Sequence, residues 1–179
     1  MRICAKIREK SQLGTDGVIY PADMYTFYSI PSVGNILDIE IATAQTGYQR
    51  VLVPYRISKR IFLNVKDERG ECFDNWEWHF KMILSSVEDN PIYDKLFLEC
   101  RFDFSDHAER KRWGEYGTAT VVRNDVVLAS IVLAFLPAGE NDRIKIDNGY
   151  YKYENTHFKK DGEMQIIVGE WVGYDELFS

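Results

Sequence analysis

The fold of this chain is decided by the stretch RIKIDNGYYKYENTHFKKDGEMQIIVGEWV, residues 143–172. Within it, Asn148-Gly149 separates two runs in which apolar and polar residues alternate. This dipeptide in such a setting is the strongest short-range signal of a β-hairpin. Asp161-Gly162 then turns the chain into a third run, EMQIIVGEWV. Two such turns close together predict three consecutive antiparallel strands, a β-meander.

The same alternation continues upstream of the meander. Residues 96–104 alternate between apolar and polar side chains, which predicts a strand with one buried face. Two further runs, 118–122 and 126–135, are separated by Arg-Asn-Asp, and Asn and Asp tolerate the backbone of a tight turn. We therefore expect another hairpin there. The run 126–135 is apolar on both faces, so we expect it to be covered on both sides.

The N-terminal part of the chain is more weakly patterned but still favours strands. Residues 35–42 alternate between apolar residues and acids, and strand-like runs follow at 48–55 and 60–65. There is no internal repeat, no low-complexity segment and no flexible linker. A length of 179 residues fits one domain of ordinary size. We therefore expect a single domain spanning residues 1–179.

One segment predicts a helix instead. Between about residues 75 and 88, apolar residues recur at helical spacing: Trp76, Phe80, Ile83, Leu84 and Val87. Asp74 is a suitable N-cap, with Glu77 three residues later, and Asn90-Pro91 is suited to end the helix. The predicted fold class is mainly β (α+β): an antiparallel, twisted sheet or flattened barrel with this one central helix packed on it. A two-sheet sandwich is the alternative.

Composition limits the classes of partner and the cellular location. The 22 basic and 28 acidic residues give a net charge of −6, which argues against nucleic acid and is compatible with a basic protein partner. The chain begins without the unbroken apolar region of a signal peptide, and no run reaches the roughly 18 apolar residues of a membrane span. Three widely separated cysteines favour reduced thiols. These features predict a cytoplasmic protein that does not bind membranes.

Signatures of catalysis and metal binding are largely missing. The sequence contains no GxxxxGK[ST], GxGxxG, GxSxG, CxxC or HExxH motif, so we expect neither a cofactor nor a metal. One candidate polar site remains, formed by Glu99, Arg101 and Asp103 on one strand face, with His107 in the following polar segment. The simpler interpretation of this row is a solvated sheet face with ion pairs.

Surplus aromatic residues are the candidates for partner binding. On the predicted helix, Trp78 projects away from the apolar face, near Met82. On the meander, Tyr151 and Tyr153 share one strand face, and Trp171 follows on the next strand. Aromatic residues and Met are enriched at interfaces, although strands and cores are also rich in aromatics.

Three functional hypotheses follow. The leading one is a non-catalytic protein-binding module, such as an inhibitor or immunity-type protein that neutralises a basic partner. It rests on the acidic balance, the surplus aromatics and the lack of catalytic motifs. The second is a small-ligand-binding β-barrel protein. The third is a hydrolase-type enzyme with a dispersed carboxylate and histidine site, which would need converging carboxylates in a cleft.

Overall fold

The computed structural model describes residues 2–8, 25–41, 47, 49–65, 78–89, 91, 93–103 and 118–179. Eleven strands form one open sheet in the order β2-β1-β6-β5-β4-β9-β10-β11-β7-β8, with β3 also paired to β4. The strands are β1 (Arg2–Arg8), β2 (Tyr25–Phe27), β3 (Ile36–Ile41), β4 (Val51–Phe62), β5 (Phe80–Ser86), β6 (Lys95–Asp103), β7 (Thr118–Arg123), β8 (Val126–Val132), β9 (Asp142–Ile146), β10 (Gly149–Phe158) and β11 (Met164–Val172). A short 3-10 helix, η2 (Tyr174–Phe178), follows. The mainly β prediction is confirmed.

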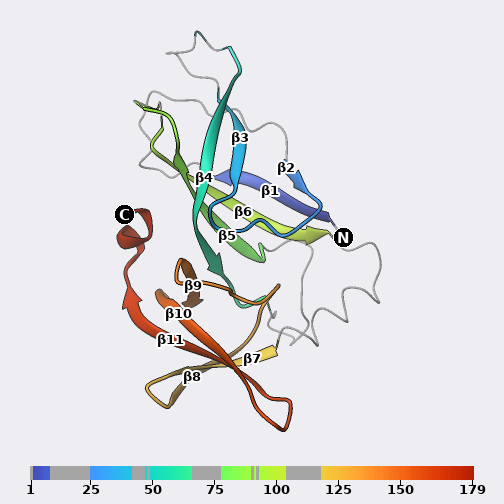
Figure 1. Cartoon of the computed structure of the whole chain (residues 1–179), viewed down its shortest axis with the longest axis vertical. Coiled ribbons are helices and arrows are strands. Elements are labelled where there is room, and N and C mark those ends of the chain that lie inside the picture. The colour runs from blue at the N-terminus through green and yellow to red at the C-terminus, as the bar shows by residue number, and fades with distance from the viewer. Residues whose placement is uncertain are drawn as a thin grey trace.

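The sheet has two parts, which Figure 1 shows in the upper and lower halves of the molecule. Strands β1 to β6 form the N-terminal sheet, in which all pairs are antiparallel. Strands β7 to β11 form the C-terminal sheet, in which β11 and β7 pair in parallel. A second parallel pair, β4 with β9, joins the two parts. The sheet is therefore mixed: the predicted antiparallel pairing holds for the other described strand pairs, but not for these two.

Turns are present at the places where the sequence predicted reversals, but the first comprises Asp147 and Asn148, one residue earlier than the predicted Asn148-Gly149, and Gly149 begins β10. The chain reverses between β9 and β10 at Asp147, where φ is 51°, and between β10 and β11 at Gly162, where φ is 90°. Between β7 and β8, Asn124 and Asp125 both adopt positive φ, 50° and 63°. Asn and Asp tolerate this left-handed backbone better than most residues. The meander of β9, β10 and β11 is confirmed, as is the hairpin before it.

The helix predicted for about residues 75–88 was wrong, because the structure has strand β5 from Phe80 to Ser86. Residues 74–77 lie outside the described part of the chain. The reason for the error is that a short apolar run fits either a helix or a strand covered on both faces. In β5, Met82 and Leu84 face the main core while Ile83 packs into a second cluster on the opposite face. Pairing with β4 and β6 on both sides stabilises the strand.

The core is filled by side chains from both parts of the sheet. Among the largest fully buried residues of the main cluster are Tyr55, Phe62, Phe80, Ile3, Ile39 and Met82. The N-terminal sheet curls enough that the Tyr25 hydroxyl of β2 accepts a hydrogen bond of 3.1 Å from the Glu40 amide of β3. It nevertheless stays an open sheet by its strand pairing, so the predicted barrel does not close.

A second, smaller cluster lies on the other face of the N-terminal sheet. Ile61, Ile83 and Phe97 are covered there by Leu177 of η2. Lys59 fixes this C-terminal segment, because its ammonium donates to the backbone oxygens of Leu177 (3.0 Å) and Ser179 (2.7 Å). Burial lowers the pKa of Lys59. Both faces of β4, β5 and β6 are therefore covered.

A buried ion pair connects the two parts of the sheet. The Arg60 guanidinium of β4 donates two hydrogen bonds, of 2.8 and 2.7 Å, to the Asp142 carboxylate of β9. The amides of Ala138 and Gly139 donate to the same carboxylate, and Arg60 also donates to the backbone oxygen of Pro31. The two side chains are nearly inaccessible to solvent. Such full hydrogen bonding is what makes a buried charge pair tolerable.

Candidate functional site

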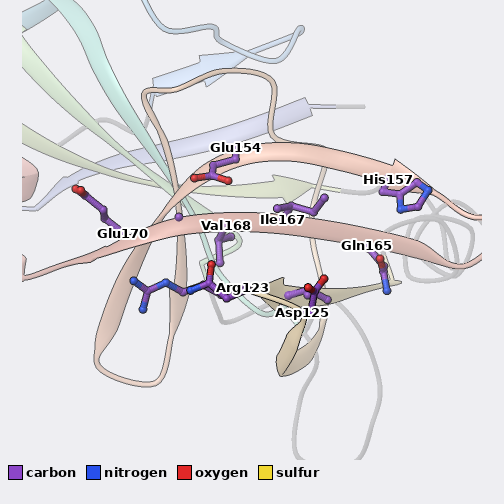
Figure 2. A pocket seen from close by; sticks show the side chains of 11 residues that line it. Arg123, Asp125, Glu154, His157, Gln165, Ile167, Val168 and Glu170 are labelled. Atoms are coloured by element: carbon purple, nitrogen blue, oxygen red, sulfur yellow. The ribbon is translucent and has the colours of Figure 1, made fainter.

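A surface hollow lies on the C-terminal sheet. It is an open groove of about 500 Å³ between β10, β11 and the turn that joins β7 to β8. Figure 2 shows the polar side chains that line it: Arg123, Asp125, Glu154, His157, Gln165 and Glu170. A neighbouring hollow of about 370 Å³ shares Glu154 and Glu170 and adds Glu140 and Lys152. We call the two hollows together the acidic groove.

Two irregularities of the β10–β11 ribbon place Glu154 in the acidic groove. The strand register shifts between Tyr153 and Asn155, so Glu154 sits at a β-bulge. A bulge turns its side chain away from the regular alternation of a strand. Opposite it, β11 has Gly169, where a Cβ atom would collide with the Glu154 carboxylate. The missing side chain of Gly169 is therefore what lets this carboxylate lie against the backbone of β11.

Strand register builds the floor of the groove. Residues directly opposite each other on neighbouring strands point to the same side of a sheet. One row across the sheet consists of Asn155 on β10, Ile167 on β11, Val122 on β7 and Val127 on β8. The next row consists of His157, Gln165, Thr120 and Ser130. The C-terminal sheet thus presents an apolar strip beside polar groups on its outer side.

The carboxylates of the acidic groove are not neutralised by neighbouring side chains. Asp125, Glu140, Glu154 and Glu170 form no ion pair with any other described residue. The Arg123 guanidinium at the groove lies 6.0 Å from the Tyr151 ring, a cation–π contact. Elsewhere in the described chain, carboxylates pair with cations, as Glu99 does with Lys81 and Glu163 does with Lys159. The groove therefore carries net negative charge, because its four carboxylates outnumber the lining cations Arg123 and Lys152.

The groove presents carboxylate oxygens that a cation could contact. A general base and its partner must lie within hydrogen-bond reach. His157 is exposed, and no hydrogen bond joins it to a carboxylate or hydroxyl of another described residue. Within the same part of the chain, no three His, Cys, Asp or Glu side chains gather in a way that would hold a metal ion.

The polar residues predicted from sequence lie far along the sheet from the acidic groove, on β6. Glu99 forms an ion pair of 3.3 Å with Lys81 of β5, directly opposite in register. The Arg101 guanidinium lies 5.9 Å from the Trp78 ring. Asp103 ends β6 and its side chain lies outside the described residues, as does all of His107. The described members of this row thus contact neighbours on the sheet face.

The five residues predicted to bind a partner fall into three groups by their exposure. Met82 and Tyr153 are buried in the main core, although Tyr153 also lines the smaller hollow of the acidic groove. Trp78 and Tyr151 are half-buried beside arginines. Trp171 is 55% exposed, and its indole lies against Gly149, where a Cβ atom would collide with it. Of the five, Trp171 offers the largest exposed aromatic surface.

Sequence reasoning did not identify Asp125, Glu154 and Glu170 as a group. Regular alternation places Glu154 on the same strand face as Lys152, and it contains no sign of the bulge that redirects the carboxylate. The parallel pairing of β11 with β7, which brings Asp125 to the same groove, joins segments about 40 residues apart in sequence. The local signal that was present is the tight turn at Asp125.

Comparison with protein families, with curated proteins and with solved structures finds no match to this chain. Among the described residues, the structure contains no helix with the length and hydrophobicity that crossing a bilayer requires.

Proposed function

We propose that this protein is a non-catalytic binding module that holds a basic segment of a partner protein in the acidic groove. An inhibitor or immunity-type protein that neutralises a basic partner is the specific form of this proposal, acting in the cytoplasm. The observation that carries it is the convergence of Asp125, Glu154 and Glu170 on one groove without an ion pair to another described residue. Lysine or arginine side chains of a partner would supply the missing cations.

The surroundings of the carboxylates suit a peptide segment better than a free cation. The floor holds Ile167 and Val122, which offer apolar contact to the aliphatic stems of Lys and Arg. Gln165 and His157 add hydrogen-bonding groups at the rim. An apolar centre with a polar rim is the usual composition of a protein interface. Trp171, on the same strand β11, adds exposed aromatic surface beyond the groove.

The two other functional hypotheses have less support. A small-ligand-binding barrel needs a closed sheet with space inside, whereas this sheet is open and its core is occupied by large side chains such as Tyr55 and Phe80. A hydrolase needs an acid or base in contact with a second reacting group. The groove supplies carboxylates, but the described residues do not pair them with a histidine or a nucleophile.

The experiment uses two labelled peptides of equal length, one of alternating lysine and serine and one of alternating glutamate and serine. Binding to the whole protein is measured by fluorescence anisotropy and mapped by NMR shifts. We expect only the lysine peptide to bind, with shifts at Gln165, Ile167 and Glu170. Glu154→Gln combined with Glu170→Gln should weaken binding of the lysine peptide about tenfold, because each exposed ion pair contributes up to about 1 kcal/mol. Added salt should weaken it as well.

A matched control separates a site from general attraction to an acidic protein. Asp38→Asn combined with Glu88→Gln removes the same charge from exposed positions on β3 and just after β5, away from the acidic groove. We expect this control to bind the lysine peptide like the unmodified protein. Equal weakening in both double variants, or no binding of the lysine peptide at all, would show that the acidic groove is not the binding site.

A further inference from the structure

The segment η2 covers part of the second face of the N-terminal sheet and is held there by few contacts (Figure 1). Leu177 is its one fully buried residue. Phe178 packs beside Phe97, with 6.1 Å between ring centroids, and Tyr174 lies 6.3 Å from Tyr150. The rest of η2 is exposed, so a small part of its surface fixes its position.

The backbone of η2 adds little to this attachment. The amides of Glu176 and Ser179 donate within the segment, to the oxygens of Gly173 and Glu176. A 3-10 helix of five residues is not stable alone, because its hydrogen-bond geometry is poor and short helices depend on tertiary packing. Strands β4, β5 and β6, by contrast, pair with neighbours on both sides. This contrast allows η2 to open locally while the sheet stays folded.

The surface beneath η2 combines an apolar floor with a lysine that binds main-chain oxygens. Lys59 donates to the backbone oxygens of Leu177 and Ser179, at 3.0 and 2.7 Å. Every peptide segment has such oxygens, so this contact does not depend on the side chains of η2. The floor consists of Ile61, Ile83 and Phe97. Only the floor therefore requires a particular side chain, which in η2 is a leucine.

The border of this surface is positively charged. Burial, followed by repulsion from Arg143 and Lys95, lowers the pKa of Lys59. Lys59 forms no ion pair with a carboxylate of another described residue. Arg143 donates to the backbone oxygens of Glu140 and Asp142, and its buried Nε has no hydrogen-bond partner within the described part of the chain. Such a border favours a segment that carries acidic residues.

We propose that η2 is a displaceable cover over a second binding site, which takes a partner segment of the same chemistry as η2. This chemistry is two acidic residues followed by a leucine and an aromatic residue, as in Asp175–Phe178. The leucine fills the floor, the aromatic ring packs on Phe97, and the acids match the cations at the border. The site lies on the N-terminal sheet and is independent of the function proposed for the acidic groove.

The attachment of η2 to the same chain sets how readily a partner binds. A tethered segment competes at an effective concentration in the millimolar range. A free segment of equal chemistry therefore binds poorly while η2 is in place, and much better once η2 is weakened. The cover thus keeps the site closed to weak, nonspecific ligands.

The test uses a labelled peptide of sequence VGYDELFS, residues 172–179, and measures its binding to the whole protein by fluorescence anisotropy. Leu177→Asp should release η2 from the floor, so this variant should bind the peptide at least about tenfold more tightly than the unmodified protein. Leu177→Ala is a milder variant that should shift binding in the same direction. Leu52→Asp makes the same change at an exposed leucine of β4 and should bind like the unmodified protein. Circular dichroism checks that all variants fold.

Changes in the peptide test its chemistry without affecting the fold of the protein. The peptide carrying Leu177→Asp should not bind to any variant. The peptide carrying Asp175→Asn and Glu176→Gln should bind the Leu177→Asp protein several-fold more weakly, because it lacks the charges that match Lys59 and its neighbours. Hydrogen exchange of the unmodified protein tests the opening itself: the Glu176 and Ser179 amides should exchange about a hundredfold faster than the hydrogen-bonded amides of β5.

The proposal is overturned if both folded Leu177 variants bind the peptide no better than the unmodified protein. It is equally overturned if the peptide with Leu177→Asp binds as well as the original, or if the η2 amides are as protected as those of β5. Sedimentation velocity covers the remaining occupant. A dimer of the unmodified protein that Leu177→Asp abolishes would assign the site to η2 of a second copy and overturn its assignment to a partner.

Discussion

The N-terminal and C-terminal sheets are built from similar strands but differ in what covers them. In the N-terminal sheet, the main core fills one face of β4, β5 and β6, and η2 packs on the other. In the C-terminal sheet, the core fills one face, while the outer face of β10, β11 and β7 forms the floor of the acidic groove. Similar alternating sequences thus form a doubly covered structural region in one place and an open surface in the other.

The carboxylates of the two regions also differ in whether other parts of the protein cover and bind them. At the junction with the N-terminal sheet, Asp142 is buried and fully hydrogen-bonded to Arg60 and two backbone amides. In the acidic groove, Glu154 and Glu170 are exposed and have no ion-pair partner among the described residues. The buried carboxylate of this fold is thus neutralised within it, whereas the carboxylates of the acidic groove remain exposed to solvent.

The largest expected effect comes from breaking the buried junction. Asp142→Ala removes the carboxylate but leaves the Arg60 guanidinium buried, so the free energy of unfolding should fall by about 3–5 kcal/mol. Urea denaturation measures the change. Glu40→Ala, which breaks the half-exposed pair with Arg50, is the control and should cost less than about 1 kcal/mol. Similar losses in the two variants would contradict the structural role of the junction.

The same substitution, Val→Ala, should lower the free energy of unfolding by different amounts in the covered N-terminal sheet and on the exposed face of the C-terminal sheet. Val53 of β4 is 6% exposed in the main core, and Val127 of β8 is 62% exposed. Val53→Ala removes two buried methyl groups and should cost about 2 kcal/mol of unfolding free energy. Val127→Ala should change it by less than about 0.5 kcal/mol, because the start of the run 126–135 is exposed and not covered on both sides as its sequence predicted. An equal loss in both variants would show that the outer face is covered in solution.

The smallest expected effect is a change in how stability depends on pH. Burial raises the pKa of Tyr55 well above its ordinary value of 10.0, with a further contribution from Glu88. The unfolded chain releases this proton near pH 10 while the folded protein keeps it, so stability present below pH 10 is lost as the pH rises above it. Tyr55→Phe should flatten this decline.

The Tyr55→Phe variant should also be less stable than the unmodified protein at neutral pH. It removes the hydrogen bond of 2.8 Å from the Tyr55 hydroxyl to the Tyr93 backbone oxygen, which should cost about 1 kcal/mol. Denaturation midpoints measured from pH 8 to pH 11 test both parts of the prediction. Tyr150 also has a raised pKa, caused first by burial, so Tyr150→Phe is the comparison variant. If the stability of the Tyr55→Phe variant falls as steeply above pH 10 as that of the unmodified protein, the prediction is wrong.

The strands and turns of this protein were largely determined by local sequence. Asn124, Asp125 and Gly162 adopt positive φ because their side chains, or the lack of one, tolerate it. Alternation placed Ile39 and Ile41 on the core side of β3. These features depend on residues that are close in the chain, and sequence patterns record such short-range preferences directly.

Only the tertiary structure decided the remaining features. The segment from Phe80 to Ser86 became a strand because distant partners cover both of its faces, and its apolar spacing alone also fits a helix. The acidic groove arises from a bulge at Glu154 and a parallel pairing of β11 with β7. Long-range pairing and a displaced register leave no periodic trace in the sequence, because their energy comes from contacts between distant residues.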